Sequence, residues 1–394
     1  MRAVKRSTER ILTTHVGSLP RPKPLLDKMR DGDSGPDMDG AVTEAVGAAV
    51  DHQLAHGVDV VTDGEQGKTS FFAYIGERLT GFEPRPELKA NQWTGEVSSF
   101  PEYYAAYFER AMTGGSVVTP QPQVCVGPVA YRGQAAIAQQ IADLRAALAG
   151  RPDAEVEAFI PATAPSGVGI MTGGADVANE YYPSYADYLF AVADALAEEY
   201  RAIVDAGFLL QVDDPALTDV LGDTTLTDAQ KQERAELFVE ATNRALRGIP
   251  ADRVRFHTCY GINEGPRVHD VPLAEVIPLM LKVQAMGLSF EAANARHEHE
   301  YHAWENVTLP GDRVLLPGMI THASNIVEHP ELIAERLTRY ARIVGRENVI
   351  ASTDCGFSSQ ATYRPEVDPR VMWAKFDAMR EGATLASERL WPAR

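Results

Sequence analysis

The stretch Val254-Arg255-Phe256-His257-Thr258-Cys259-Tyr260-Gly261 is a short apolar run that ends in a histidine and a cysteine two residues apart. On a β-strand, residues i and i+2 point to the same face. We therefore expect His257 and Cys259 to aim together, with Phe256 and Thr258 on the opposite side. A second run with a similar ending is Val349-Ile350-Ala351-Ser352-Thr353-Asp354-Cys355-Gly356. The chain is thus expected to carry thiols at the ends of two different strands.

Short apolar runs that end in polar or small residues recur along the chain. Near-continuous hydrophobic runs are typical of parallel strands that are covered on both faces. The sequence therefore predicts eight buried parallel strands, at residues 11–17, 58–65, 158–165, 208–214, 254–261, 288–292, 314–321 and 349–355.

Longer segments with helical periodicity separate these runs. The segment 185–206 places Leu189, Val192 and Leu196 on one stripe, and Gly207 follows as a candidate helix cap. Segments 228–246 and 331–344 have the same pattern. Eight strand–helix repeats in a chain of 394 residues predict an α/β fold, a (β/α)8 TIM barrel. A doubly wound open sheet is the alternative, but no G-x-G-x-x-G follows the first run, which weakens its dinucleotide-binding version.

The segment 81–150 interrupts this rhythm between the second and third predicted strands. It is rich in aromatic, proline and glycine residues, including Trp93, Tyr107 and Phe108, and it has a helical pattern of its own at 135–148. We predict one barrel domain over residues 1–394, with 81–150 as an insertion that forms a lid or part of the substrate wall. A packed surface extension or a contact in a homo-oligomer is the alternative.

Composition excludes several classes of partner. The formal net charge of −18 repels phosphate backbones, so we expect no nucleic-acid partner. No stretch of about 18 apolar residues predicts a membrane span. The basic N-terminus lacks the apolar region of a secretion signal. Three cysteines in a chain of this length do not make a disulfide framework, so a reducing, cytoplasmic location is expected.

The ends of the predicted strands are unusually rich in acids, thiols and histidines. In a barrel of this type, functional groups gather at the C-terminal ends of the strands. The number of such groups exceeds what helix capping requires. The residues are His15, Ser18, Asp63, Glu65, Asp213, Asp214, His257, Cys259, Glu291, His322, Asp354 and Cys355.

Four of these residues, His257, Cys259, Glu291 and Cys355, form a candidate Zn²⁺ site. Zn²⁺ binds imidazole nitrogen, thiolate sulfur and carboxylate oxygen. The His-x-Cys triplet alone is a weak signal, since many such triplets arise by chance. Cys355 strengthens it because a barrel brings distant strands to one mouth. A carboxylate beside apolar Phe290 also needs a partner when buried.

The ligand set indicates a type of chemistry. Two thiolates and one carboxylate make the site net negative, which is poor for a strong Lewis acid. Such a site suits a substrate thiol, because a coordinated thiol is deprotonated outright and can attack an electrophilic carbon. We therefore predict zinc-dependent transfer of a methyl or other alkyl group to a small-molecule thiol through a zinc-bound thiolate, with a second small molecule as the alkyl donor.

Five motifs in chain order resemble those of the cobalamin-independent methionine synthase family, specifically its catalytic C-terminal barrel. The family patterns are T-T-x-x-G-S, G-E, Q-I-D-E-P-A-L, H-x-C-Y and D-C-G. The matching segments are TTHVGS at 13–18, DGE at 63–65, QVDDPAL at 211–217, HTCY at 257–260 and DCG at 354–356.

This resemblance implies roles for individual residues. It implies zinc binding by His257, Cys259, Glu291 and Cys355. Ser18, Glu65 and Asp213 would hold the amino-acid part of homocysteine, with His15 at the same strand end as Ser18. His322, which resembles the histidine of the family's I-H-S-P-N motif, would assist proton transfer and act with Glu65 and Asp213 in catalysis. Structural alternatives are a helix cap for Asp213, a turn before Pro20 for Ser18 and a core position for His322.

The sequence also departs from that family. The usual enzyme has two barrels, and its aromatic folate platform is not recognisable here. Short single-barrel relatives include epoxyalkane:coenzyme M transferase, which opens an epoxide in the same way. Coenzyme M carries a sulfonate and would need cations, for which Arg21, Lys68, Arg267 and Arg296 are candidates. A tetrapyrrole decarboxylase and a non-catalytic thiol-binding or zinc-binding barrel are the further alternatives.

Overall fold

Eight parallel strands form a nearly closed barrel in the computed structural model, which describes residues 4–71, 73–88, 93–110, 116–118, 121–150, 156–168, 178–261 and 265–392. The sheet order is β1-β10-β9-β8-β7-β6-β5-β2. The two outer strands of this sheet, β1 and β2, approach each other, because the Asp59 amide just before β2 donates to the Thr13 carbonyl of β1 at 3.0 Å. The strands are β1 Leu12–Thr13, β2 Val60–Val61, β5 Glu157–Thr163, β6 Leu209–Asp213, β7 Val254–His257, β8 Gly287–Phe290, β9 Val314–Ile320 and β10 Ile350–Thr353.

Each of these strands falls within or overlaps one of the predicted apolar runs, so the predicted (β/α)8 TIM barrel is confirmed. Every residue of β5 to β9 in this sheet is buried. Alternate residues serve two different cores: Phe159 and Leu209 pack in one apolar cluster, while the next residues, Ile160 and Leu210, belong to the larger cluster. A strand that is apolar on both faces can be covered on both, which explains the continuous hydrophobic runs.

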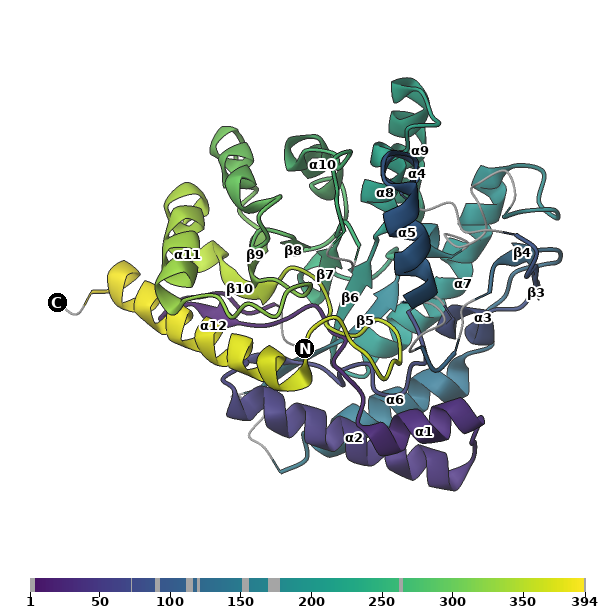
Figure 1. Cartoon of the computed structure of the whole chain (residues 1–394), viewed down its shortest axis with the longest axis horizontal. Helices are drawn as coiled ribbons and strands as arrows, with labels where there is room; N and C mark the ends of the chain where they lie inside the picture. Colours follow the sequence, from purple (N-terminus) through teal and green to yellow (C-terminus); the bar gives the residue numbers. More distant parts are fainter. Residues whose placement is uncertain are drawn as a thin grey trace.

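Helices surround the strands (Figure 1). Adjacent helices pack against one another around the barrel, as α2 does with α6, α6 with α7, α7 with α9 and α11 with α12. The longer ones are α1 Lys23–Asp31, α2 Pro36–Ala55, α6 Gln134–Ala147, α7 Tyr185–Asp205, α9 Asp228–Ala245, α11 Pro330–Val344 and α12 Pro369–Leu390. The shorter ones are α3 Tyr74–Arg78, α4 Thr94–Ser99, α5 Pro101–Phe108, α8 Ala216–Gly222 and α10 Leu273–Met280, with 3-10 turns η2 Pro165–Gly167, η3 Ala251–Arg253, η4 Glu298–Asn306 and η5 Arg346–Asn348.

Local signals explain where these helices begin and end. The Ser184 hydroxyl accepts the Asp187 amide at the start of α7, and Thr227 and Gln230 form a reciprocal capping box at the start of α9. Gly207, just after α7, has a φ of +96°, a backbone conformation that favours glycine. The predicted helices 185–206, 228–246 and 331–344 therefore match α7, α9 and α11 within a residue or two at each end.

The segment 81–150 contains elements outside the barrel sheet. Strands β3 Phe82–Pro84 and β4 Gln123–Cys125 form a separate antiparallel pair, which Figure 1 shows at the rim of the molecule. Helix α6, by contrast, packs between α2 and α7 as one of the helices around the barrel. Residues 89–92, 111–115 and 119–120 of the segment lie outside the described residues. Among the helices that the structure describes, none combines the length and the hydropathy needed to cross a membrane.

Candidate active site

A cavity of about 560 Å³ lies at the C-terminal ends of the barrel strands. Polar side chains from several strand ends reach it, and helix α5 and the residue that precedes α4 contribute aromatic side chains to its wall. The polar residues at the strand ends are Ser18 after β1, Glu65 after β2, Asp213 on β6, His257 and Cys259 on and after β7, His322 after β9 and Cys355 after β10. The aromatic residues are Trp93, Tyr107 and Phe108, with Phe71 and Phe357 from the barrel loops.

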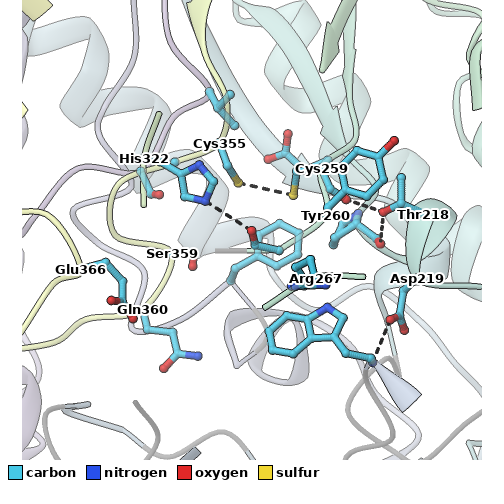
Figure 2. A pocket seen from close by; sticks show the side chains of 18 of the residues that line it. Thr218, Asp219, Cys259, Tyr260, Arg267, His322, Cys355, Ser359, Gln360 and Glu366 are labelled. Atoms are coloured by element: carbon cyan, nitrogen blue, oxygen red, sulfur yellow. Dashed lines mark hydrogen bonds between the residues drawn. The ribbon is translucent and has the colours of Figure 1, made fainter. Parts of the chain in front are cut away.

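Three of the predicted metal ligands converge in this cavity. The ligand atoms of His257, Cys259 and Cys355 all lie within 4.8 Å of one another, and all three residues are buried. The Cys355 thiol donates to the Cys259 sulfur at 3.4 Å, and Figure 2 shows the two sulfurs facing each other. Strands β7 and β10 therefore bring together residues that lie 96 positions apart in the sequence.

The His257 ring shows that this cluster fits a metal ion. Its Nδ1 contacts the Ser289 hydroxyl at 3.0 Å, whereas its Nε2 is buried without a hydrogen-bond partner among the residues that the structure describes. A ligating histidine commonly has its second nitrogen fixed in this way. One imidazole nitrogen and two sulfurs are a donor set that Zn²⁺ prefers.

The two thiols differ in acidity because they interact with each other. The hydrogen bond from Cys355 lowers the pKa of Cys259 well below its usual value, and the nearby His257 ring lowers it further. The same hydrogen bond, together with burial, raises the pKa of Cys355. The pair therefore loses its first proton more readily than an isolated buried thiol does, because the hydrogen bond between the sulfurs and the adjacent imidazole stabilise the thiolate that remains.

Glu291, the fourth predicted ligand, lies next to this cluster but outside the group of three. Its Oε1 accepts the Tyr260 amide at 2.8 Å, one residue after Cys259, and its Oε2 accepts the side-chain amide of Asn294 at 2.7 Å. Arg296 approaches the same oxygen at 3.4 Å. Burial and the charge of Asp354 raise the pKa of Glu291 to about 8.

Two buried acids, Glu65 and Asp213, line the cavity. Burial raises the pKa of both carboxyl groups, that of Asp213 to about 7. Gln211 donates to Asp213 at 2.8 Å, and the Oε2 atom of Glu65 is buried without a hydrogen-bond partner among the described residues. These acids can accept hydrogen bonds from a cationic group that enters the cavity.

Ser18 and His322 also reach the cavity, whereas His15 does not. The Ser18 hydroxyl accepts the Ser358 amide at 3.3 Å. The Nε2 atom of His322 contacts the Gly261 carbonyl at 3.3 Å, and burial lowers the pKa of its ring. His15 is fully buried behind the cavity, where its Nε2 contacts Gln53 at 2.8 Å and its ring packs edge-on against two phenylalanines.

Sequence reasoning did not single out Asp219, which lines the far side of the cavity with Arg267, a residue predicted only as a candidate cation for a sulfonate (Figure 2). Asp219 accepts the Trp93 amide at 3.1 Å, and burial raises its pKa to about 6. The Arg267 guanidinium lies over the Trp93 ring, 4.0 Å from its centroid. The aromatic richness of the 81–150 segment was the available signal for Trp93, but no local pattern links that residue to the barrel loops.

Comparison with known proteins agrees with this architecture. The family described as cobalamin-independent synthase, catalytic domain, matches residues 155–375. A methionine synthase of Sulfolobus acidocaldarius is 25% identical over 350 residues, covering 87% of this chain and 85% of the relative. A methionine synthase of Saccharolobus solfataricus is 24% identical over 384 residues, covering 96% and 95%.

Solved structures show the same fold. A B12-independent methionine synthase from Shewanella sp. W3-18-1, in complex with selenomethionine, has a TM-score of 0.71 at 18% identity, covering 98% of this chain and 100% of that one. A putative vitamin-B12-independent methionine synthase from Listeria monocytogenes has a TM-score of 0.63 at 19% identity, with the same coverage. Because the family match spans more than half of the sequence, this chain belongs to the cobalamin-independent synthase catalytic-domain family.

Proposed function

We propose that this protein transfers a methyl group to the sulfur of homocysteine or a closely similar amino-acid thiol. The observation that carries the proposal is one cavity that holds a His257–Cys259–Cys355 cluster together with the buried acids Glu65 and Asp213. The cluster suits a sulfur ligand, and the acids suit an ammonium group. Similarity to methionine synthases over nearly the whole chain supports the same reaction.

Zn²⁺ is the cofactor that the donor set favours, and we assign His257, Cys259, Cys355 and Glu291 to hold it. Bound there, it would supply the acidity that ionises a substrate thiol, whose ordinary pKa of about 8.5 leaves it mostly protonated at neutral pH. Ser289 orients the His257 ring from behind. Tyr260 and Asn294 hold the Glu291 carboxylate beside the cluster.

The acids favour an amino-acid thiol over a sulfonate such as coenzyme M. Arg21 donates to the carbonyls of Glu65 and Lys68, and Lys68 donates to the Pro161 carbonyl at 2.7 Å. Arg296 is paired with Asp270. Of the four candidate cations for a sulfonate, Arg267 is the one that lines the cavity. Glu65 and Asp213 therefore make the cavity beside the cluster a site for an ammonium group.

His322 is placed to handle the proton that the donor's leaving group requires. Burial lowers the pKa of its ring, so the imidazole is neutral at pH 7; it can take up the proton that the substrate thiol loses and pass it to the leaving group of the donor. Its Nε2 is engaged by the Gly261 carbonyl, while its Nδ1 has no hydrogen-bond partner among the described residues. We assign the proton transfer to Nδ1.

A panel of thiols and donors tests the proposal. Zinc-loaded protein is incubated with homocysteine or coenzyme M, each with methylfolate, methylcobalamin or epoxypropane, and the thioether is sought by mass spectrometry. We expect methionine from homocysteine with a methyl donor. A product from coenzyme M with epoxypropane, and from no other pair, would assign the protein to epoxide opening. Zinc binding with no thioether from any pair would favour a non-catalytic barrel.

A further inference from the structure

Asp354, a carboxylate that the proposed reaction does not use, is fully buried between β10 and the end of β8. Its Oδ1 accepts the backbone amides of Ala292 and Ala293, both at 2.7 Å. Its Oδ2 accepts the backbone amide of Asn294 at 2.9 Å and the Asn294 side chain at 3.0 Å. One side chain thus provides the acceptors for three successive backbone amides of the turn that follows β8.

To reach this turn, the Asp354 side chain must cross a strand. The sheet order β10-β9-β8 places β9 between the two elements, and Gly318 of β9 pairs with Ser352 of β10. A Cβ atom at position 318 would overlap the Asp354 carboxylate and lie 2.8 Å from its backbone nitrogen and Cα. Gly318 therefore opens the path along which Asp354 reaches the next strand.

The turn that Asp354 holds begins at Glu291. The Asn294 side-chain amide donates to Glu291 at 2.7 Å as well as to Asp354, so it bridges the two carboxylates. Arg336 of α11 donates to the carbonyls of Ala293 and Met319, at 2.9 and 3.0 Å, and holds the turn from the other side. Because Cys355 directly follows Asp354, a single residue connects the two strand ends that carry Glu291 and Cys355.

We propose that Asp354 is a positioning residue that fixes the Glu291 carboxylate relative to Cys355 by holding the 292–294 turn across Gly318. The inference rests on the proposed function, in which both Glu291 and Cys355 bind Zn²⁺. Groups that orient metal ligands typically contribute about 10–100-fold to metal affinity.

The first test is the zinc affinity of Asp354→Asn, measured by competition with a chromogenic chelator. The amide places N–H donors opposite the backbone amides of the turn, so we expect affinity to fall by about 10–100-fold. Asp143→Asn is the matched control, because Asp143 is a buried carboxylate of α6 that accepts from Thr43 at 2.7 Å and Gln139 at 2.9 Å, outside the cavity. Its zinc affinity should equal that of the unmodified protein.

A double-mutant cycle separates positioning from general destabilisation. If Asp354 acts through Glu291, then Asp354→Asn should change the affinity by less than about twofold in a Glu291→Gln background. An equal loss in both backgrounds, or an unchanged affinity in the single variant, overturns the inference. If Asp354→Asn does not fold, Asn294→Ala breaks the bridge between the two carboxylates, and we expect a loss of about fivefold; no loss overturns the inference.

The same measurements distinguish this inference from the proposed function. The proposed function is overturned, and with it the role of Asp354, if the unmodified protein binds no Zn²⁺. It is also overturned if the Cys259→Ser variant binds Zn²⁺ as tightly as the unmodified protein does. Tight binding that Cys259→Ser abolishes but Asp354→Asn leaves intact overturns the role of Asp354 alone.

Discussion

His257 and His15 show how a single side chain acquires or loses a functional position. Both rings are buried and both belong to strand ends, yet each is fixed by a different neighbour. Ser289 contacts the Nδ1 atom of His257 and leaves Nε2 without a hydrogen-bond partner among the described residues, whereas Gln53 holds the Nε2 atom of His15, which does not line the cavity. The partner of one ring nitrogen thus decides what the other nitrogen can bind.

At the same scale, Asp213 predicts how amino-acid binding depends on pH. Its pKa of about 7 means that the carboxyl group is largely protonated below neutrality and attracts an ammonium only when ionised. The affinity for methionine, which has the ammonium but no ionisable thiol, should therefore rise as the pH increases from about 6 to about 8, the interval around that pKa. Calorimetric titrations at several pH values measure this.

Asp213→Asn is the matching variant, and we expect it to bind methionine more weakly with no rise over this pH range. An unchanged pH profile would contradict the assignment.

The effect of pH on the stability of the fold is opposite to its effect on binding. Since the folded-state pKa is higher than the unfolded value, the contribution of Asp213 to stability is greatest at low pH and is lost as the pH rises through about 7.

At the scale of elements, α12 is joined to the loop that carries His322. Lys375 of α12 is fully buried and donates to Glu328 at 2.7 Å, and the other oxygen of Glu328 accepts the Thr321 amide at 2.7 Å. Helix α12 also packs against α11, β1 and β9. The last helix of the chain therefore fixes the backbone directly before His322.

This pair predicts a large stability effect. Lys375→Met leaves the Glu328 carboxylate buried without its cation, so the free energy of unfolding should fall by about 3–5 kcal/mol in denaturant titrations. Adding Glu328→Gln should restore much of it, because the amide oxygen still accepts the Thr321 amide. The exposed pair Arg370–Asp368 is the control, where Arg370→Ala should cost at most about 1 kcal/mol. Equal costs at the two pairs would contradict the burial argument.

At the scale of the whole molecule, the barrel connects regions that are far apart in the chain. The proposed zinc ligands come from the ends of β7, β8 and β10, and the acids come from the ends of β2 and β6. A ligand that binds only the folded barrel stabilises it by mass action. Zinc would thus act on the stability of the entire barrel.

We accordingly expect chelation of zinc to lower the free energy of unfolding. At free Zn²⁺ of about 100 times its dissociation constant, the difference should be about 2.7 kcal/mol, measured as a shift of the thermal or denaturant midpoint. Cys355→Ser should show little response to zinc or chelator. A zinc response of the same size in Cys355→Ser would place the metal elsewhere.

The sequence alone determined the barrel and most of the strand-end residues that line the cavity. Strand and helix periodicity are local, so the alternation of His257 with Thr258, and the run of apolar residues before each polar end, were sufficient for that. Three features were not predictable in this way. They are the bridge of Asn294 between Glu291 and Asp354, the position of His15 behind the cavity and the contact of Arg267 with the Trp93 ring. Each depends on contacts between segments far apart in the chain. Closure of the barrel therefore decided which polar groups meet, because only the packed strands and loops set the distances and hydrogen bonds between them.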